Sequence, residues 1–350
     1  MYSKKIVFLY PSLAPYFTYA LQEAAKNKDI LFHVVFEPTS HEAPLQNLEK
    51  DLDNLKFYTY QDIARQGFSW FKHIKPDLVL CSGWKNKIYL YWVLRIKING
   101  IRTGVLFDAP WKNTIKQNII ANLFKFGLKF LFDWAWVIGK PQRTFAQKMG
   151  FIDQRILEGF YIADAHLFKP KADEKVHEKK ILLFIGRYVT EKGLPMLWHA
   201  FLEAKRITQD QDWQLHCLGT GYLWESKVLN KDIVHFGFVQ PEDIPAIAGQ
   251  STAFILPSNE ENWGMVLHEM ACMGLPLICS DAVFAKTAFL QDNGFIFESQ
   301  NQESLTKVLI QLFQSTTEER HAMGQKSVEL AKTYTIEKWQ ESLQKMLSLR

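Results

Sequence analysis

Cysteine is scarce in this sequence, with four residues among 350 and no Cys-x-x-Cys pair. Thiols scattered in this way are typical of reduced side chains in a cytosolic protein and argue against a disulfide framework. None of the ten histidines forms a His-x3-His or HExxH set. We therefore expect no bound metal.

Long hydrophobic runs are also missing. No stretch reaches the roughly 18 uninterrupted apolar residues that a membrane-spanning helix requires. The first apolar run, Ile6–Tyr10, is too short for the hydrophobic region of a signal peptide and is typical of a buried strand. We expect a cytoplasmic protein, with the inner face of the membrane as a second place where it could act.

Acidic residues are rare in one region. The net charge is only +4, but between Trp84 and Arg155 13 basic residues stand against three acidic ones. Such a field attracts anionic partners, namely phospholipid, nucleic acid or a phosphorylated acceptor, and the alternative is a solvated face without a partner. Within 111–136 the lysines fall on opposite helical faces, so we expect two helices broken near Gly127 rather than one membrane-lying helix.

Short apolar runs alternate with helix-length segments along the whole chain. Continuous strands of this kind are typical of parallel sheets covered on both faces, and two series predict an α/β protein with two doubly wound domains. The predicted strands are Ile6–Tyr10, Leu31–Phe36, Leu78–Cys81, Gly104–Phe107 and Ala135–Ile138, then Ile181–Ile185, Leu215–Leu218, Val234–Phe236, Ala253–Leu256 and Leu277–Cys279.

The domain boundary is predicted within Ala163–Lys179, which carries Pro170 and a charged run typical of a linker. We place the first domain at 1–165 and the second at 166–333. Residues 334–350 form an amphipathic helix pattern, with apolar residues at fourfold spacing from Trp339. We expect this helix to return to the first domain.

The second half carries two groups of charged residues after predicted strands. Gly186-Arg187 and Glu191-Lys192-Gly193 follow the strand Ile181–Ile185, at the end of a parallel sheet where ligands bind. Arg187 and Lys192 supply a planar fork and a point charge, which suit a diphosphate. Each alone is more often a surface residue.

The second group follows the strand Ala253–Leu256. Glu261 lies in the loop, and Glu269 lies in a helix predicted from about Met265 to Met273. Two carboxylates so placed can accept hydrogen bonds from sugar hydroxyls, and Gly264 permits a close approach of backbone N–H groups to a ligand. Without the surrounding pattern, a solvent-facing Glu269 would be the better interpretation.

The ordered series of these motifs resembles the donor domain of glycosyltransferase family 4. The resemblance covers residues 181–300, and residues 1–165 match it only in layout. It rests on Gly186-Arg187, Glu191-Lys192-Gly193, Leu218-Gly219-Thr220-Gly221, Val234 to Val239, and Leu256-Pro257-Ser258 through Glu261-Asn262-Trp263-Gly264 and Glu269-Met270-Ala271 to Gly274-Leu275-Pro276.

The resemblance implies the GT-B architecture, with two facing Rossmann-like domains and an interdomain cleft. It implies a retaining, metal-independent transfer in which Arg187, Lys192 and Glu261 are catalytic and no cofactor is needed besides the nucleotide-diphosphate sugar as co-substrate. Glu269 would bind the ribose hydroxyls. The donor-binding residues implied are Gly186, Phe238, Val239, Asn262, Trp263, Gly264, Met265, Val266 and Glu269.

The expected partners are a nucleotide sugar and a glycan or polyprenyl-diphosphate-linked acceptor in surface polysaccharide biosynthesis. Membrane-surface contact would run through the basic region 84–155, and we expect no nucleic acid partner. The first half departs from the family, because Pro11 to Tyr16 replace its glycine-rich loop and Asp108 stands where many relatives have a histidine. Ser12 and Asp108 are the acceptor-side candidates, and Asp108 is equally suited to a turn cap.

Weaker patterns support other functions. Asp51-Leu52-Asp53 and Asp210-Gln211-Asp212 fit a metal-binding DxD, but neither follows a buried strand, and Gly219-Thr220-Gly221 lacks the third glycine of a dinucleotide site. His268 is expected to be a surface or packing residue. The alternatives to transfer are a GT-B sugar epimerase or phosphorylase and a catalytically silent subunit.

Overall fold

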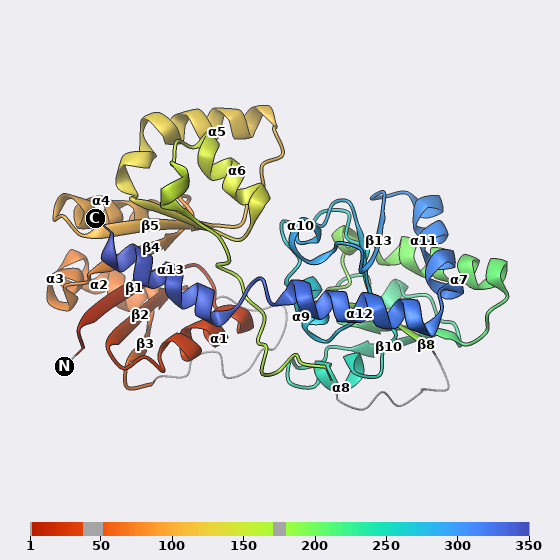
Figure 1. Ribbon diagram of the computed structural model, residues 1–350. Coiled ribbons are helices and arrows are strands. Elements are labelled where there is room, and N and C mark those ends of the chain that lie inside the picture. The colour runs from red at the N-terminus through yellow and green to blue at the C-terminus, as the bar shows by residue number, and fades with distance from the viewer. Residues whose placement is uncertain (1, 38–51, 171–179, 350) are drawn as a thin grey trace. The chain divides into compact units, whose positions relative to one another are not determined.

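The computed structural model describes residues 2–37, 52–170 and 180–349. The chain divides into two compact units, Met1–Ile162 with Tyr334–Arg350 and Ala163–Thr333, which we call the first and second domains (Figure 1). The boundaries predicted from the sequence lie after residues 165 and 333.

The first domain is built on a seven-stranded sheet with the order β3-β2-β1-β4-β5-β6-β7. Every neighbouring pair is parallel. The central strand β1 is buried without interruption from Ile6 to Tyr10, as expected where helices cover both faces. The strands are β1 Lys4–Tyr10, β2 Ile30–Phe36, β3 Leu55–Thr59, β4 Leu78–Ser82, β5 Arg102–Phe107, β6 Trp134–Val137 and β7 Ile156–Leu157.

Two helical layers cover this sheet, and alternate residues of β1 face one layer or the other. Ile6 and Phe8 face the layer of α1 and α13. Val7 and Leu9 face the layer that contains α2 to α6 (Figure 1). The helices are α1 Pro15–Ala24, α2 Tyr60–Gln66, α3 Phe68–Ile74, α4 Lys87–Ile98, α5 Ile115–Phe126, α6 Lys140–Lys148 and α13 Ile336–Ser348, with short 3₁₀ helices η1 Leu128–Leu131 and η2 Asp153–Arg155.

The last helix, α13, packs in the first domain. Trp339 is fully buried there, its ring centroid 4.9 Å from that of Trp136, and its Nε1 donates to the carbonyl oxygen of Phe160 at 3.0 Å. A buried indole N–H needs such a partner, so this bond fixes the position of the helix as well as burying its apolar side.

The second domain contains a six-stranded parallel sheet with the order β10-β9-β8-β11-β12-β13. The strands are β8 Lys180–Ile185, β9 Trp213–Leu218, β10 Ile233–Gly237, β11 Ala253–Leu256, β12 Leu277–Ser280 and β13 Gly294–Phe297. The helices are α7 Leu194–Thr208, α8 Ile244–Ala248, α9 Met265–Cys272, α10 Lys286–Phe289, α11 Gln302–Gln314 and α12 Thr317–Ala331, with 3₁₀ helices η3 Thr190–Lys192 and η4 Trp224–Ser226.

The ten strands predicted from the sequence are confirmed, and so is the break near Gly127, where α5 ends at Phe126 and η1 begins at Leu128. The predicted helix that carries Glu269 is confirmed as α9, which stops before Gly274 in the left-handed region at φ 76°. Among the described residues, no helix combines the length and apolar character needed to cross a membrane.

Candidate functional site

Three neighbouring strands of the second domain reach a glycine at the same edge of the sheet, because Gly186 follows β8, Gly219 follows β9 and Gly237 ends β10. The amide of Gly186 donates to the carbonyl oxygen of Leu218 at 3.0 Å, and the amide of Gly219 donates to that of Gly237 at 2.7 Å. A Cβ on Gly219, whose φ is +127°, would lie 2.0 Å from the carbonyl oxygen of Gly186. The edge above β8, β9 and β10 is therefore lined by closely approaching backbone.

The two charged loops predicted from the sequence are joined by hydrogen bonds. Asn259 binds the backbone of the first loop. Its amide donates to the carbonyl oxygen of Glu191 at 2.7 Å, and its Nδ2 donates to that of Thr190 at 3.0 Å. A Cβ on Gly193 would lie 2.2 Å from the carbonyl oxygen of Pro257. Loops 190–193 and 257–262 are thus held together as one connected element.

This element brings two predicted catalytic side chains into contact. Lys192 Nζ forms an ion pair with Glu261 Oε2, and each side chain is 18% exposed. Ser258 Oγ lies 3.4 Å from the same carboxylate oxygen. Because the pair is half-buried, each charge has given up part of its hydration, and the mutual attraction offsets that cost.

The amino end of α9 lies next to Glu261. Gly264 precedes the helix at φ +99°, where a Cβ would approach Leu256 Cδ2 to 2.9 Å, and no side chain caps the first turn. The amides of Met265 and Val266, both half-buried, begin this turn. Uncapped amides and the helix dipole favour an anion here.

Trp263 contributes packing rather than a ligand-facing ring. Its side chain is 3% exposed and lies edge-on to Phe289. Its carbonyl oxygen accepts from the amide of Ala285 at 2.9 Å. The donor-binding role implied for Trp263 is therefore compatible only with a contact through its backbone.

Glu269 lies one helical turn after Met265 and is half-buried. Burial, and then the nearby carboxylate of Asp164, raise the pKa of Glu269 to about 7. Asp164 Oδ1 accepts from the amides of His166 and Leu167 at 2.9 and 3.0 Å. The sequence pattern did not indicate Asp164, since a turn-capping aspartate carries no signal of a distant carboxylate.

Glu269→Gln should stabilise the protein above pH 7. The folded state holds the Glu269 proton between pH 4.5 and about 7 while the unfolded state has lost it, so this group's contribution to stability falls as pH rises through that window. The neutral glutamine avoids a cost of up to about 3 kcal/mol. Urea unfolding should give a higher midpoint for the variant above pH 7 and equal midpoints near pH 4.5; a variant less stable throughout would contradict this environment for Glu269.

The architecture is that of solved glycosyltransferase structures. A glycosyltransferase from Rickettsia africae superposes with a TM-score of 0.76, at 14% identity over 99% of this chain and 98% of that one. HepE from Anabaena, in complex with UDP and glucose, superposes with a TM-score of 0.69, at 14% identity over 99% of each chain. The fold is GT-B.

Within this GT-B chain, residues 167–329 match the family model of glycosyl transferases group 1. An uncharacterized glycosyltransferase of Haemophilus influenzae is 30% identical over 51% of each protein. Spore coat protein SA of Bacillus subtilis is 27% identical over 50% of this chain and 49% of its own length. The chain thus matches about half the length of these curated relatives.

The other predicted donor-side residues lie at the same edge of the GT-B second domain. Arg187 is exposed directly after Gly186, Asn262 is exposed beside Glu261, and Phe238 and Val239 are half-buried after β10. Two side chains hold this end of β10: Tyr188, which the sequence did not indicate, and His235, which belongs to the run Val234 to Val239 but was given no role. Tyr188 Oη lies 2.8 Å from Nδ1 of His235, whose Nε2 donates to the carbonyl oxygen of Val228 at 2.9 Å.

The acceptor-side candidates belong to the first domain. Ser12 follows β1 and Asp108 follows β5, so both lie at the carboxyl edge of that sheet and both are half-buried. The carbonyl oxygen of Asp108 accepts from Gln142 Nε2 at 3.0 Å. Burial, with the field of Asp108 as a smaller cause, raises the pKa of the Tyr161 hydroxyl.

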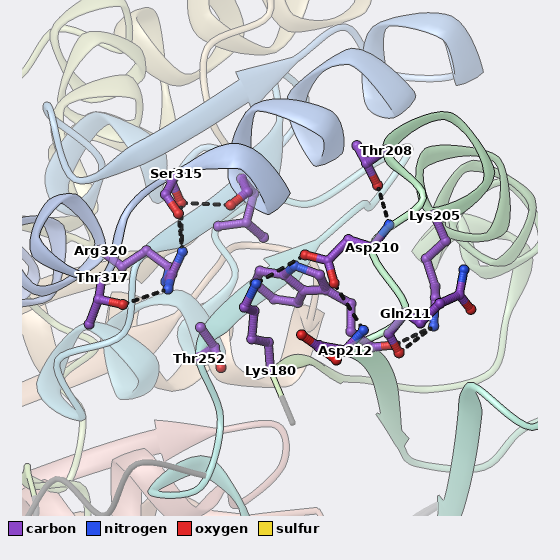
Figure 2. Close-up of polar contacts among 12 residues, drawn as sticks. Lys180, Lys205, Thr208, Asp210, Gln211, Asp212, Thr252, Ser315, Thr317 and Arg320 are labelled. Carbon is purple, nitrogen blue, oxygen red and sulfur yellow. Dashed lines mark hydrogen bonds and ion pairs between the residues drawn. The ribbon is translucent and has the colours of Figure 1, made fainter. Parts of the chain in front are cut away.

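The second DxD, Asp210-Gln211-Asp212, makes structural contacts at the amino edge of the second sheet, opposite the carboxyl edge of the candidate site. Asp210 Oδ2 forms an ion pair with Lys180 Nζ at 3.0 Å, and Asp210 Oδ1 accepts from the amide of Asp212 at 2.9 Å (Figure 2). This carboxylate joins the first residue of β8 to the turn that precedes β9. Of the other DxD, Asp51 lies outside the described residues.

His268 is a packing residue, as predicted. It is 1% exposed and its ring stacks on Phe289 with centroids 4.2 Å apart. Nδ1 accepts from the amide of Ala163 at 3.1 Å while Nε2 faces the carbonyl oxygen of Ala331 at 3.2 Å. Burial lowers the pKa of His268 to about 4, so the ring is neutral at pH 7.

Proposed function

We propose that the chain is a retaining, metal-independent glycosyltransferase of family 4. It transfers a sugar from a nucleotide-diphosphate sugar to a glycan or polyprenyl-diphosphate-linked acceptor, in surface polysaccharide biosynthesis. The observation that carries the proposal is the contact between Lys192 and Glu261 beside the uncapped first turn of α9. The UDP and glucose bound to HepE, and the Klebsiella pneumoniae relative from a cps region, 25% identical over 31% of this chain, support it.

The donor diphosphate is proposed to bind beside Lys192, at the amino end of α9. Lys192 leaves Glu261 and binds a phosphate oxygen, and the amides of Met265 and Val266 bind the same anion from the helix end. Exposed Arg187 closes over the diphosphate as a bidentate donor. The base lies against Phe238 and Val239, and ionised Glu269 accepts from the ribose hydroxyls.

The transfer step follows from these contacts. The bond between the anomeric carbon and the diphosphate oxygen breaks, and the acceptor hydroxyl attacks on the same face of the sugar. Its proton passes to the leaving phosphate oxygen, so no carboxylate pair of the glycosidase type is required. Arg187 and Lys192 stabilise the negative charge that grows on the leaving nucleoside diphosphate. Glu261, released by Lys192, accepts from a donor-sugar hydroxyl.

Product analysis tests the reaction class. The full chain is incubated with labelled nucleotide sugars and a polyprenyl-diphosphate glycan, and the product is examined by NMR. The proposal predicts a labelled glycan whose new linkage has the anomeric configuration of the donor. An epimerised donor with no glycan product would assign the chain to the epimerases, and an inverted linkage would overturn the retaining mechanism.

Glu261→Gln should affect the two parts of the donor in opposite directions. The variant removes the competitor that holds Lys192 and a negative charge next to the diphosphate, so a nucleoside diphosphate without sugar should bind several-fold more tightly. Turnover should fall, because the amide is a weaker acceptor for the sugar hydroxyl. Calorimetric titration and initial rates measure the two effects; a matching loss in both would show that Glu261 does not compete for Lys192.

A further inference from the structure

The outer surface of the first domain carries most of the exposed large apolar side chains of the described residues. Ten of the sixteen lie within residues 88–152, and nine of these ten are on helices that cover one face of the first sheet (Figure 1). We call these ten the apolar face. They are Ile88, Tyr91, Leu94 and Ile98 of α4, Ile115, Ile119, Leu123 and Phe126 of α5, Phe130 of η1, and Ile152.

Helix α5 shows why this face needs an occupant. Ala121 and Phe124 are buried in the core. Ile115, Ile119, Leu123 and Phe126 repeat at helical spacing on the nearly opposite side, with exposed fractions of 82%, 55%, 68% and 76%. A surface helix of a water-soluble domain normally has one apolar side, whereas this helix has two. Large apolar side chains exposed along one side of a helix in this way mark an interaction site.

The charges on these elements decide which occupant fits. The sequences of α4, α5 and η1 contain no acidic residue. Their cations are Lys87, Arg95, Lys97, Lys116, Lys125 and Lys129. Two copies of this chain meeting through these three helices would bring their cations together with no acid on the same helices to offset them, which opposes self-association. An amphipathic surface that interleaves lysine with Phe, Leu and Ile matches an anionic lipid interface.

A basic cavity opens at the end of the apolar face. It has a volume of about 390 Å³ and is lined by Lys129, Arg155 and Asp133, with exposed Phe130 and Ile152 among the lining residues. The single carboxylate, Asp133, is already paired with Lys97 and accepts from the amide of Thr103 at 3.0 Å. The cavity therefore keeps net positive charge next to apolar side chains.

The surroundings of Lys129 favour an anion in this cavity. Its Nζ lies 5.1 Å from the ring centroid of Phe151. Burial lowers the pKa of Lys129, and the cations Lys97 and Arg155 lower it further, while Asp133 acts in the opposite direction. A phosphate in the cavity would offset this crowding of cations.

We propose that the apolar face docks on an anionic phospholipid bilayer, with a lipid phosphate in the cavity of Lys129 and Arg155. Phe126, Phe130 and the isoleucines insert at the boundary between headgroups and acyl chains. The cavity lies beside Asp133, at the amino end of β6, so this contact is distinct from the carboxyl edge where Ser12 and Asp108 lie. The apolar face would serve the proposed sugar transfer only by holding the chain at the membrane. Lipid binding can therefore be tested without a nucleotide-sugar donor.

Vesicle co-sedimentation of the full chain tests the proposal. The protein should bind phosphatidylcholine vesicles containing phosphatidylglycerol, bind pure phosphatidylcholine weakly, and lose affinity with added salt. Ile119→Ser, Leu123→Ser and Phe126→Ser combined should weaken binding at least roughly tenfold. Lys129→Gln should weaken it about fivefold. The matched control, Ile207→Ser with Leu229→Ser, removes exposed apolar side chains of the second domain and should change nothing.

Two outcomes would overturn the docking surface. One is equal vesicle binding by the wild type and the triple variant, or none by either. The other is a wild-type dimer in analytical ultracentrifugation that the triple variant dissociates without any vesicle binding, which would assign the face to a second copy. The melting-temperature shift caused by nucleotides should be the same in the triple variant, so loss of lipid binding and failure of the donor site remain separable.

Discussion

Lys192→Ala should lower kcat by roughly two to three orders of magnitude, the range found when one donor to a developing oxyanion is removed. The physical reason is that, in the proposed transfer, the half-buried positive charge of Lys192 stabilises the leaving diphosphate as it becomes more negative. KM for the donor should rise less, because in the proposed site Arg187 and the α9 amides would still bind the ground state. Steady-state rates with a saturating acceptor measure both parameters.

The matched control is Lys180→Ala. Lys180 also forms an ion pair in the same domain, with Asp210 at 3.0 Å, but at the amino end of β8 rather than beyond its carboxyl end (Figure 2). Its removal should cost a little stability and leave kcat unchanged. If the two variants lose the same activity, the effect of Lys192 is one of folding and its assignment to the leaving group is wrong.

Gly193→Ala should disrupt the proposed donor site, whereas the same substitution at Gly83, a glycine with nearly the same φ, should be tolerated. A Cβ on Gly193, φ +67°, would lie 2.2 Å from the carbonyl oxygen of Pro257, which is backbone and cannot turn aside. Loops 190–193 and 257–262 would separate, and Lys192 would lose Glu261. We expect a loss of several kcal/mol, comparable with overpacking a core, and loss of nucleotide binding.

Gly83 supplies the comparison, because its φ is +68° and a Cβ there would meet nothing within 4 Å. Gly83→Ala should cost only the left-handed conformation, about 1 kcal/mol. Urea unfolding of the two variants therefore separates the clash from the conformational penalty. Equal losses in the two proteins would mean that the loops are not held together at Gly193.

The strands that the sequence predicted are those with continuous apolar runs. The three it missed, β3, β7 and β13, all lie at sheet edges. Only Leu55 of β3 is buried, β7 has two residues, and Phe297 alone is buried in β13. Edge strands face a neighbour on one side only, so they require less apolar sequence and give a weaker pattern.

The candidate site, like the strands, could be predicted from the sequence only where a local feature marks it. Glycines at strand ends and an uncapped helix start are local features, and Gly186, Gly193 and Gly264 stand where the sequence placed them. Long-range contacts were not predictable. No pattern indicated that Lys192 would pair with Glu261, 69 positions away, or that Asp164 would raise the pKa of Glu269. Such pairs depend on how separate loops are brought together by hydrogen bonds such as that of Asn259 to Thr190.

The most direct test is calorimetric titration of UDP, GDP, ADP and CDP into the full chain, its Lys192→Ala variant and its Lys180→Ala variant. A nucleotide-diphosphate site at the carboxyl edge of the second sheet predicts that at least one of the four binds the wild type and the Lys180 variant alike, and binds the Lys192 variant at least tenfold more weakly. Binding that Lys192→Ala leaves intact, or no binding of any of the four, would contradict it.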